Sequence, residues 1–266
     1  MAYYLVKARA VKDKFYELEE KLFSGHISSL RPFGRAMDLS LRNAKYDLDG
    51  YLVWEEEDYC SPPLAMERQM VLDHYFYDLS IVRVNEGEGW NQISHFPNVW
   101  IIHKGLPYRN GEKPLTRKGI PHQQLTQNPD IEVYKRFSDK LFRLPDTVKA
   151  SSLISVPGAI ALWLNSDKVN VVSDAFMIAN EFAHLHPAYD GSLHIMAPPN
   201  WVDEIIEKGW GERHPLAGDM IASNALMIYA PRNDVEIDIA YNILLLSYWR
   251  AKGKIIPSPK NLLGTP

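Results

Sequence analysis

The first part of the chain alternates between short extended and short helical patterns. Residues 2–10 (AYYLVKARA) alternate between the two faces and are rich in aromatic and β-branched side chains, which predicts a strand. Residues 11–25 carry apolar side chains at helical spacing and end at Gly25, a plausible C-cap. Further strands are expected over 33–44, 50–59 and 79–84, and a second helix over 64–76. The order β-α-β-β-α-β predicts a ferredoxin-like α+β domain over residues 1–96.

The rest of the chain, residues 97–266, mixes helical and extended patterns without a regular repeat. Residues 104–130 are dense in Gly, Pro and Asn but also carry Leu, Tyr and Ile, which predicts a long ordered loop. Helices are expected over 131–144, 173–185, 200–209 and 233–253, and strands over 152–164, 192–198 and 225–231. We therefore expect a second, mixed α+β domain.

Composition narrows the classes of partner and compartment. The 266 residues include 29 basic and 33 acidic side chains, for a formal net charge of −4, which argues against nucleic acid as a partner. The apolar runs are too short to cross a bilayer, and the first residues lack a signal-peptide pattern, so no membrane association is expected. A single cysteine, Cys60, suits a reducing cytoplasm. Two helices on one face of the first sheet would leave its other face to be covered, so a homodimer through the N-terminal domain is an open expectation.

Candidate chemistry is concentrated in two segments rich in histidine. EFAHLHPAYDGSLHIM (181–196) and GWGERHPLAG (209–218) together hold four of the nine histidines. The first interpretation is a divalent metal site, with His184, His194 and His214 as ligands, although their spacing fixes no coordination geometry. The second is acid–base or electrophilic catalysis, with Glu181 or Asp190 orienting the imidazoles. The third is that these histidines are hydrogen-bonded core residues, and the residues alone leave all three open.

Neighbouring motifs add candidates for substrate contacts. Three glycines around Arg213 and His214 permit close backbone approach, but the pattern also fits a helix end and a surface loop. Arg232 follows an expected strand, where it would bind an acidic or phenolate substrate or pair with Glu236. PHQQL (121–125) offers an imidazole and two amides from the ordered loop. The serines lack a nucleophile-elbow context, so a serine hydrolase is not expected.

From about residue 115 onward, the succession of these motifs resembles the luciferase-domain family, whose named members are the luciferases of bioluminescent fungi. The resemblance is carried by PHQQLTQ (121–127), SLISVPGAIALWL (152–164), EFAHLHPAYDGSLHIMAP (181–198), GWGERHPLAG (209–218) and MIYAPRNDVEID (227–238). It implies an enzyme that adds O2 to an electron-rich pyrone without metal or flavin, through an endoperoxide-type intermediate. The N-terminal domain, which resembles small α+β domains of bacteria, stands where the fungal enzymes carry a hydrophobic membrane anchor.

The hypothesis that results is a cofactor-independent, luciferase-like oxygenase acting with O2 on a small aromatic, pyrone or polyketide-type molecule. The histidines would deprotonate a substrate enol and stabilise the resulting anion, and the positive charge of Arg213 or Arg232 would add to this stabilisation. The predicted catalytic residues are Glu181, His184, His186, His194, Arg213 and His214. The predicted substrate contacts are His122, Gln123, Asp190, Trp210, Tyr229 and Arg232. A non-catalytic metabolite-binding or regulatory protein and a histidine-coordinated metalloenzyme are the alternatives.

Overall fold

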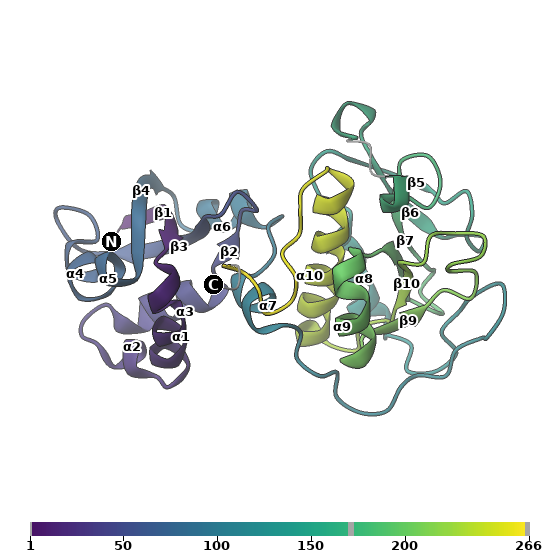
Figure 1. Ribbon diagram of the computed structural model, residues 1–266, viewed down its shortest axis with the longest axis horizontal. Coiled ribbons are helices and arrows are strands. Elements are labelled where there is room, and N and C mark those ends of the chain that lie inside the picture. Colours follow the sequence, from purple (N-terminus) through teal and green to yellow (C-terminus); the bar gives the residue numbers. More distant parts are fainter. Residues whose placement is uncertain (1, 170–172, 264–266) are drawn as a thin grey trace. The chain divides into compact units, whose positions relative to one another are not determined.

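The computed structural model describes residues 2–169 and 173–263 and divides the chain into two compact units (Figure 1). Unit 1 comprises Met1–His103 with Asn261–Pro266, and unit 2 comprises Lys104–Lys260. Both units combine helices with antiparallel sheets, so the expected α+β class is confirmed.

Unit 1 is built on an antiparallel sheet of four described strands in the order β2-β3-β1-β4. The strands are β1 (Ala2–Ala10), β2 (Lys45–Tyr46), β3 (Leu52–Asp58) and β4 (Phe76–Val84). Along β1, Val6, Ala8 and Ala10 are buried while the residues between them are partly exposed, which is the alternation that the sequence shows.

Helical segments connect these strands. They are η1 (Lys12–Lys14), α1 (Phe15–Phe23), α2 (His26–Ser29), α3 (Gly34–Asn43), α4 (Ala65–Glu67), η2 (Arg68–Leu72), α5 (Asp73–Tyr75), α6 (Glu88–Ile93) and α7 (Val99–Lys104). The strand expected over 33–44 is wrong, because α3 occupies this segment. Its Met37 and Leu41, four residues apart, are buried, whereas Leu39 between them is 64% exposed. The apparent two-residue alternation was therefore one face of a helix plus an exposed leucine.

Unit 2 contains an antiparallel sheet of six described strands in the order β5-β6-β7-β8-β10-β9. The strands are β5 (Thr147–Ser151), β6 (Ile160–Leu164), β7 (Glu181–Leu185), β8 (Leu193–Met196), β9 (Gly211–Arg213) and β10 (Ala225–Ile228). The central strands β7, β8 and β10 are buried along their whole length, so both faces of the sheet are covered here.

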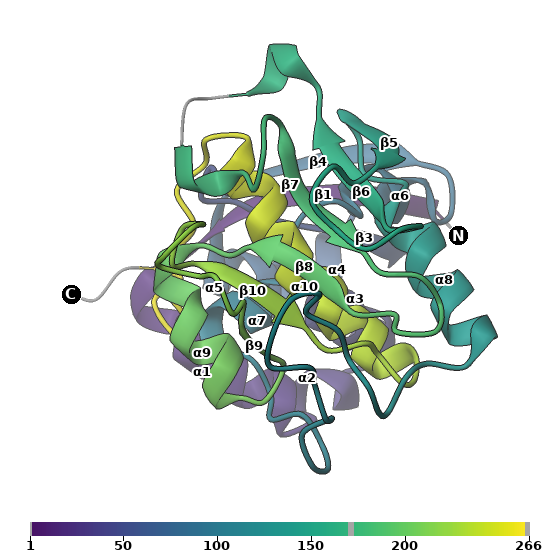
Figure 2. The ribbon, with the colours of Figure 1, turned by 90° about the vertical axis from the view of Figure 1, so that its right-hand side faces the viewer.

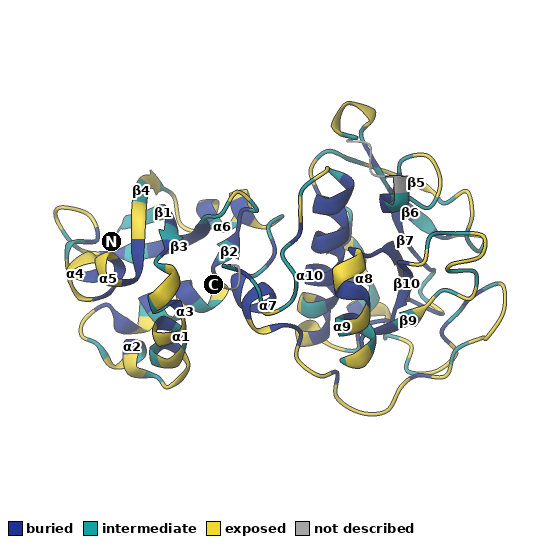
Figure 3. Cartoon of the chain, in the orientation of Figure 1, coloured by how far each residue is buried: buried dark blue, intermediate teal, exposed yellow. Residues whose placement is uncertain are grey.

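Helices cover one face of this sheet and irregular segments cover the other. The helical elements are α8 (Ile131–Leu141), η3 (Ser166–Lys168), η4 (Ser173–Ala175), η5 (Pro199–Trp201), α9 (Val202–Glu207) and α10 (Asp234–Ala251). The long helix α10 packs against β7 and β8 and is buried along most of its length (Figures 1 and 3). On the opposite face, residues 105–130 form a long irregular segment that passes in front of β8 and β10 (Figure 2).

The helices expected over 131–144 and 233–253 are confirmed as α8 and α10, and each begins at a side-chain cap. The helix expected over 173–185 is wrong, because the segment turns at Ala179 and continues as β7. Since β7 is buried on both faces, its apolar run has no alternation and cannot be told from a buried helix by periodicity. In the part of the chain that the structure describes, no helix has the length and apolar character needed to cross a bilayer.

Candidate functional site

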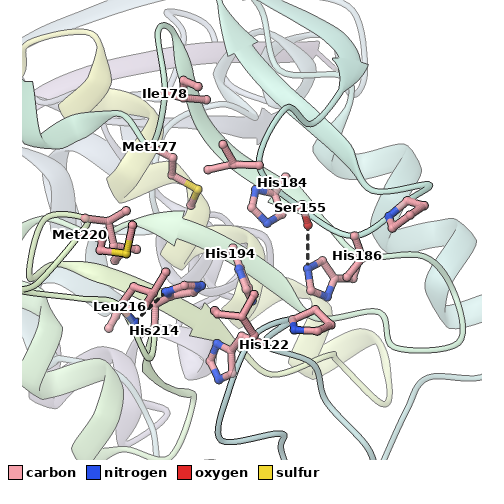
Figure 4. Close-up of a pocket in the computed structure, with 18 residues that line it drawn as sticks. His122, Ser155, Met177, Ile178, His184, His186, His194, His214, Leu216 and Met220 are labelled. Carbon is pink, nitrogen blue, oxygen red and sulfur yellow. Dashed lines mark hydrogen bonds between the residues drawn. The ribbon is translucent and has the colours of Figure 1, made fainter.

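Unit 2 encloses a cavity of about 470 Å³ on the face of the sheet opposite α10 (Figure 4). Five of the described histidines lie on its wall: His122, His184, His186, His194 and His214. Most of the remaining wall is apolar, with Ile154, Met177, Leu216 and Met220 among its side chains, and Ser155 adds a hydroxyl. The site is thus a group of imidazoles in an apolar chamber.

The register of two neighbouring strands brings three of these histidines together. His184 of β7 is the direct partner of His194 of β8, with ring centroids 4.8 Å apart. His186 lies two residues beyond His184, and its backbone N–H continues the ladder by donating to Ser192 O at 2.9 Å. Because side chains two residues apart share one face of a strand, all three imidazoles point to the same side of the sheet. The ring centroids of His186 and His194 are 4.6 Å apart.

Two buried carboxylates hold the rings of His184 and His186. Nδ1 of His184 lies 2.8 Å from Oε1 of Glu181, and Nδ1 of His186 lies 2.6 Å from Oδ2 of Asp190. An ionised carboxylate can only accept a hydrogen bond, so both rings carry a proton on Nδ1 and present the lone pair of Nε2. Ser155 Oγ lies 3.0 Å from Nε2 of His186, where its hydroxyl can donate to that lone pair.

A third carboxylate holds the histidine that comes from the long loop. Nε2 of His122 lies 2.9 Å from Oε1 of Glu212, and the other oxygen of Glu212 accepts a hydrogen bond from the Tyr229 hydroxyl at 3.1 Å. The proton of His122 is therefore on Nε2. Its buried Nδ1 has no hydrogen-bond partner among the described residues.

His214 has the same tautomer as His122, which is opposite to that of His184 and His186. The backbone N–H of Leu216 donates to Nδ1 of His214 at 3.2 Å, so the ring proton is on Nε2. The ring of His214 stands nearly edge-on to that of His122, with centroids 5.3 Å apart and an interplanar angle of 86°. His122 therefore offers a lone pair on Nδ1, and the neighbouring His214 offers an N–H donor on Nε2.

Burial keeps several of these imidazoles neutral. Desolvation lowers the pKa of His194 well below its ordinary value, and the surrounding imidazoles lower it further. Desolvation also lowers the pKa of His184, against the opposing effect of Glu181, and lowers the pKa of His214 to about 4. At neutral pH these three rings are thus uncharged bases or ligands instead of cations.

Three groups of metal-ligating side chains occur among the described residues. The ring nitrogens of His184, His186 and His194 lie within 4.8 Å of one another, and those of His122, His194 and His214 do so as well. The third group, Asp58, Cys60 and Glu67, is in unit 1. The three histidines named as ligands from the sequence, His184, His194 and His214, are therefore divided between the two groups in the cavity.

Several predicted residues lie outside the described lining of the cavity. Arg213 is half-exposed, pairs with Asp203 at 3.1 Å and donates to Ser223 O. Arg232 pairs with Glu236, Trp210 donates to Pro107 O, and the backbone oxygen of Gln123 accepts from Arg117 N–H. Glu181, Asp190 and Tyr229 support the cavity from behind, because each contacts a histidine or the carboxylate that holds one. The structure thus places the five predicted histidines on the cavity wall and three further predicted residues behind them.

Glu212 is the supporting residue that the motifs did not identify. It lies in β9 between Gly211 and Arg213, and alternation along a strand turns Arg213 away from the side that Glu212 and His214 face. If GWGERH had been predicted to form a strand, Glu212 would have been the candidate site residue in place of Arg213. Ser155 was set aside only as a hydrolase nucleophile, and its position beside His186 depends on the loop between β5 and β6.

Known proteins are similar to the part of the chain that forms this site. Residues 179–247, from the turn before β7 into α10, match the luciferase domain model. A luciferase of Armillaria gallica is 32% identical over 162 residues, which cover 52% of this chain and 58% of that protein. A luciferase of Neonothopanus nambi is 30% identical over 159 residues with the same coverage.

The chain therefore spans little more than half the length of the curated relatives it matches. No solved structure matches it significantly. The matched segment contains His184, His186, His194 and His214, whereas His122 and Ser155 lie before it. The family resemblance predicted from the histidine motifs is confirmed: the C-terminal part of this chain is similar to the fungal luciferases, and residues 179–247 match the luciferase domain model.

Proposed function

We propose that unit 2 is a luciferase-like oxygenase that acts on a small, largely apolar, enolisable molecule such as a hydroxylated pyrone. The observation that carries the proposal is the cavity of about 470 Å³, in which five imidazoles, three of them kept neutral by burial, lie around a largely apolar space. A cavity of this size accommodates one or two fused or linked rings. The similarity to fungal luciferases favours oxygenase chemistry over other reactions of an enol.

His122 is the best placed general base. Its Nδ1 lone pair is buried at the cavity wall, while Glu212 holds the opposite ring nitrogen and Tyr229 supports Glu212. This succession of groups orients an imidazole and stabilises the imidazolium that forms when it takes a proton. A substrate hydroxyl within hydrogen-bond distance of Nδ1 would lose its proton to this ring.

His214 is placed to stabilise the resulting anion. Its Nε2–H is fixed by the bond from the Leu216 amide to Nδ1, and its pKa of about 4 keeps the ring neutral at pH 7. An N–H donor fixed in an apolar chamber stabilises developing negative charge more strongly than the same donor in water. His122 and His214 therefore act as a base and donor pair on one substrate oxygen.

The reaction balances with O2 as the oxidant. The enol proton moves to His122, and the electron-rich carbon of the enolate forms a bond to one oxygen atom of O2. The terminal oxygen of the resulting peroxide anion then takes the proton back from His122, so that substrate and O2 combine into one peroxide adduct and the base is regenerated. No external reductant is required. The apolar wall includes Ile154 and Met220, which are 47% and 78% exposed, so a bound substrate would have to cover these side chains to keep water away from the anion.

Oxygen uptake with a 3-hydroxy-2-pyrone tests this function. We expect saturable uptake of one O2 per pyrone consumed, and we expect His122→Gln to lower kcat by about 10²–10⁴-fold, the usual contribution of a general base. His26→Gln is the matched control, because His26 is an exposed histidine of unit 1. Binding of the pyrone without oxygen uptake would instead favour a metabolite-binding protein.

Unit 1 has no assigned part in this chemistry. Its strand order and the helical segments between its strands support, as a proposal, the ferredoxin-like fold expected from the sequence. A homodimer through this unit and a cytoplasmic location are likewise proposals. Light scattering of the full chain tests the first of these two, with a mass of two chains as the expected result.

A further inference from the structure

We infer that His184, His186 and His194 form a binding site for one divalent transition-metal ion, of the class that includes Zn²⁺, Co²⁺ and Ni²⁺. The inference concerns ion binding alone and does not depend on the substrate proposed above. Three buried imidazoles, side by side on two hydrogen-bonded strands, provide the donor set. Figure 4 shows the three rings gathered on one side of the cavity.

The first argument is that the rings present lone pairs. Glu181 and Asp190 fix the protons of His184 and His186 on Nδ1, so each Nε2 has a lone pair for a cation, in His186 once the Ser155 hydroxyl turns away. Metal-bound histidines typically have this arrangement, with a carboxylate on the other ring nitrogen. Asp190 is itself held by the Ser192 hydroxyl at 2.6 Å and the Ser192 amide at 3.1 Å.

The second argument is that two of the nitrogens lack any other partner. Nε2 of His184 and Nε2 of His194 are buried and make no hydrogen bond to the described part of the protein. Buried polar atoms without partners are uncommon and costly, and they require an explanation such as an ion. A single cation within reach of both nitrogens satisfies the two at once, since the donor atoms of the group lie within 4.8 Å of one another.

The tautomers also decide between the two histidine groups in the cavity. In the group of His122, His194 and His214, the Nδ1 lone pair of His214 already accepts the Leu216 amide, and its Nε2 carries the proton. That ring would have to break its backbone hydrogen bond to become a ligand. His186 only has to release the hydroxyl of Ser155, which can turn toward a metal-bound water.

The donor chemistry selects the class of ion. Neutral imidazoles suit Zn²⁺, Co²⁺, Ni²⁺ and Cu²⁺, whereas Mg²⁺ and Ca²⁺ prefer oxygen ligands. A site with three protein ligands leaves a coordination position for water or another small molecule. The geometry therefore points to an accessible ion at the cavity wall.

Calorimetric titration of the full chain with Zn²⁺, after removal of metal by dialysis against a chelator, tests the inference. We expect one ion per chain, and we expect Glu181→Gln to weaken Zn²⁺ binding by about 10–100-fold through loss of the carboxylate behind His184. His194→Gln should abolish stoichiometric binding. His214→Gln and His26→Gln should bind Zn²⁺ as the unmodified chain does.

Two results would overturn the inference: no stoichiometric Zn²⁺ binding by the unmodified chain, or a loss of binding in His214→Gln as large as that in His194→Gln. X-ray absorption of the Zn²⁺-loaded unmodified chain keeps the test decisive if a variant fails to fold. Three imidazole ligands per ion are expected, and a first shell of oxygen atoms would contradict the assignment.

Discussion

His184 and His194 are direct cross-strand partners in the β7–β8 ladder, and their ring centroids are 4.8 Å apart. The backbone register of two central, buried strands therefore sets the distance between these imidazoles. Groups placed on strands are held more accurately than groups placed on loops. The site combines this rigid pair with His122, which reaches the cavity from the long irregular segment 105–130.

The two partners should respond oppositely to replacement by leucine in metal-free protein. His194→Leu removes a buried Nε2 that has no partner in the described structure, so we expect unchanged stability or a gain of about 1 kcal/mol. His184→Leu removes one of the donors to the fully buried Glu181, which then keeps only the Ser152 hydroxyl and the Leu153 amide, and we expect a loss of about 2 kcal/mol. Urea unfolding measures both values. Equal destabilisation by the two substitutions would contradict the hydrogen-bond assignment.

Acid should destabilise the metal-free protein through its neutral histidines. Burial lowers the pKa of His194 well below 6.5 and lowers that of His214 to about 4. As the pH falls below about 6.5, the unfolded chain takes up protons that the folded chain does not, so folding free energy is lost progressively toward pH 4. Denaturant unfolding at a series of pH values from about 7.5 to about 4.5 measures this loss.

The same titration in His194→Leu provides the control for the acid effect. One buried imidazole is missing from this variant, so its stability should fall less steeply with acidification than that of the unmodified chain. Parallel pH profiles for the two proteins would show that the loss arises elsewhere, for example from carboxylates.

Glu212 should act on catalysis through His122. Burial alone would raise the pKa of Glu212, but hydrogen bonds from His122, Thr116 and Tyr229 outweigh it and lower the pKa to about 2. Glu212 is therefore an anion at neutral pH, able to stabilise a His122 imidazolium. We expect Glu212→Gln to lower kcat by at least about 10-fold, because an amide cannot stabilise that charge equally well.

Steady-state kinetics separate this role of Glu212 from a general loss of structure. KM should change little in Glu212→Gln, since the residue lies behind His122 and not on the cavity wall that the structure describes. Tyr229→Phe removes one hydrogen bond to Glu212 and should have a smaller effect on kcat than Glu212→Gln. A rise in KM with unchanged kcat would contradict the assignment of Glu212 as a positioning residue.

The sequence predicted the elements with a clear period, the group of histidines, and Glu181 and Asp190 beside them, but not the support that Glu212 gives to His122. Helices α8 and α10 each begin at a polar side-chain cap and were predicted at the correct positions. The segment 173–185 was taken as a helix because β7 is buried on both faces and its sequence, EFAHL, shows no apolar–polar alternation. Had this segment been helical, His184 and His186 would point apart; in β7 and its continuation they share one face.

Contacts between residues far apart in the sequence could not be predicted from local patterns. The contact of His122 with Glu212 joins residues 90 positions apart, and that of Ser152 with Glu181 joins residues 29 apart. Neither contact produces a periodic pattern in the sequence from which it could be predicted. Arg213 was predicted as a catalytic residue because a positive charge suits an anionic intermediate, and Glu212 was not considered. In the structure Arg213 of β9 pairs with Asp203.

The most direct test of the proposed function is the absorption spectrum of a 3-hydroxy-2-pyrone bound to the protein in the absence of oxygen. Without O2 the reaction stops after proton transfer, so the spectrum reports the protonation state of the substrate in the cavity. We predict the spectrum of the enolate in the unmodified chain and in His26→Gln, and that of the neutral enol in His122→Gln. A bound neutral enol in the unmodified chain, or an enolate that persists in His122→Gln, would contradict the assignment of His122 as the base.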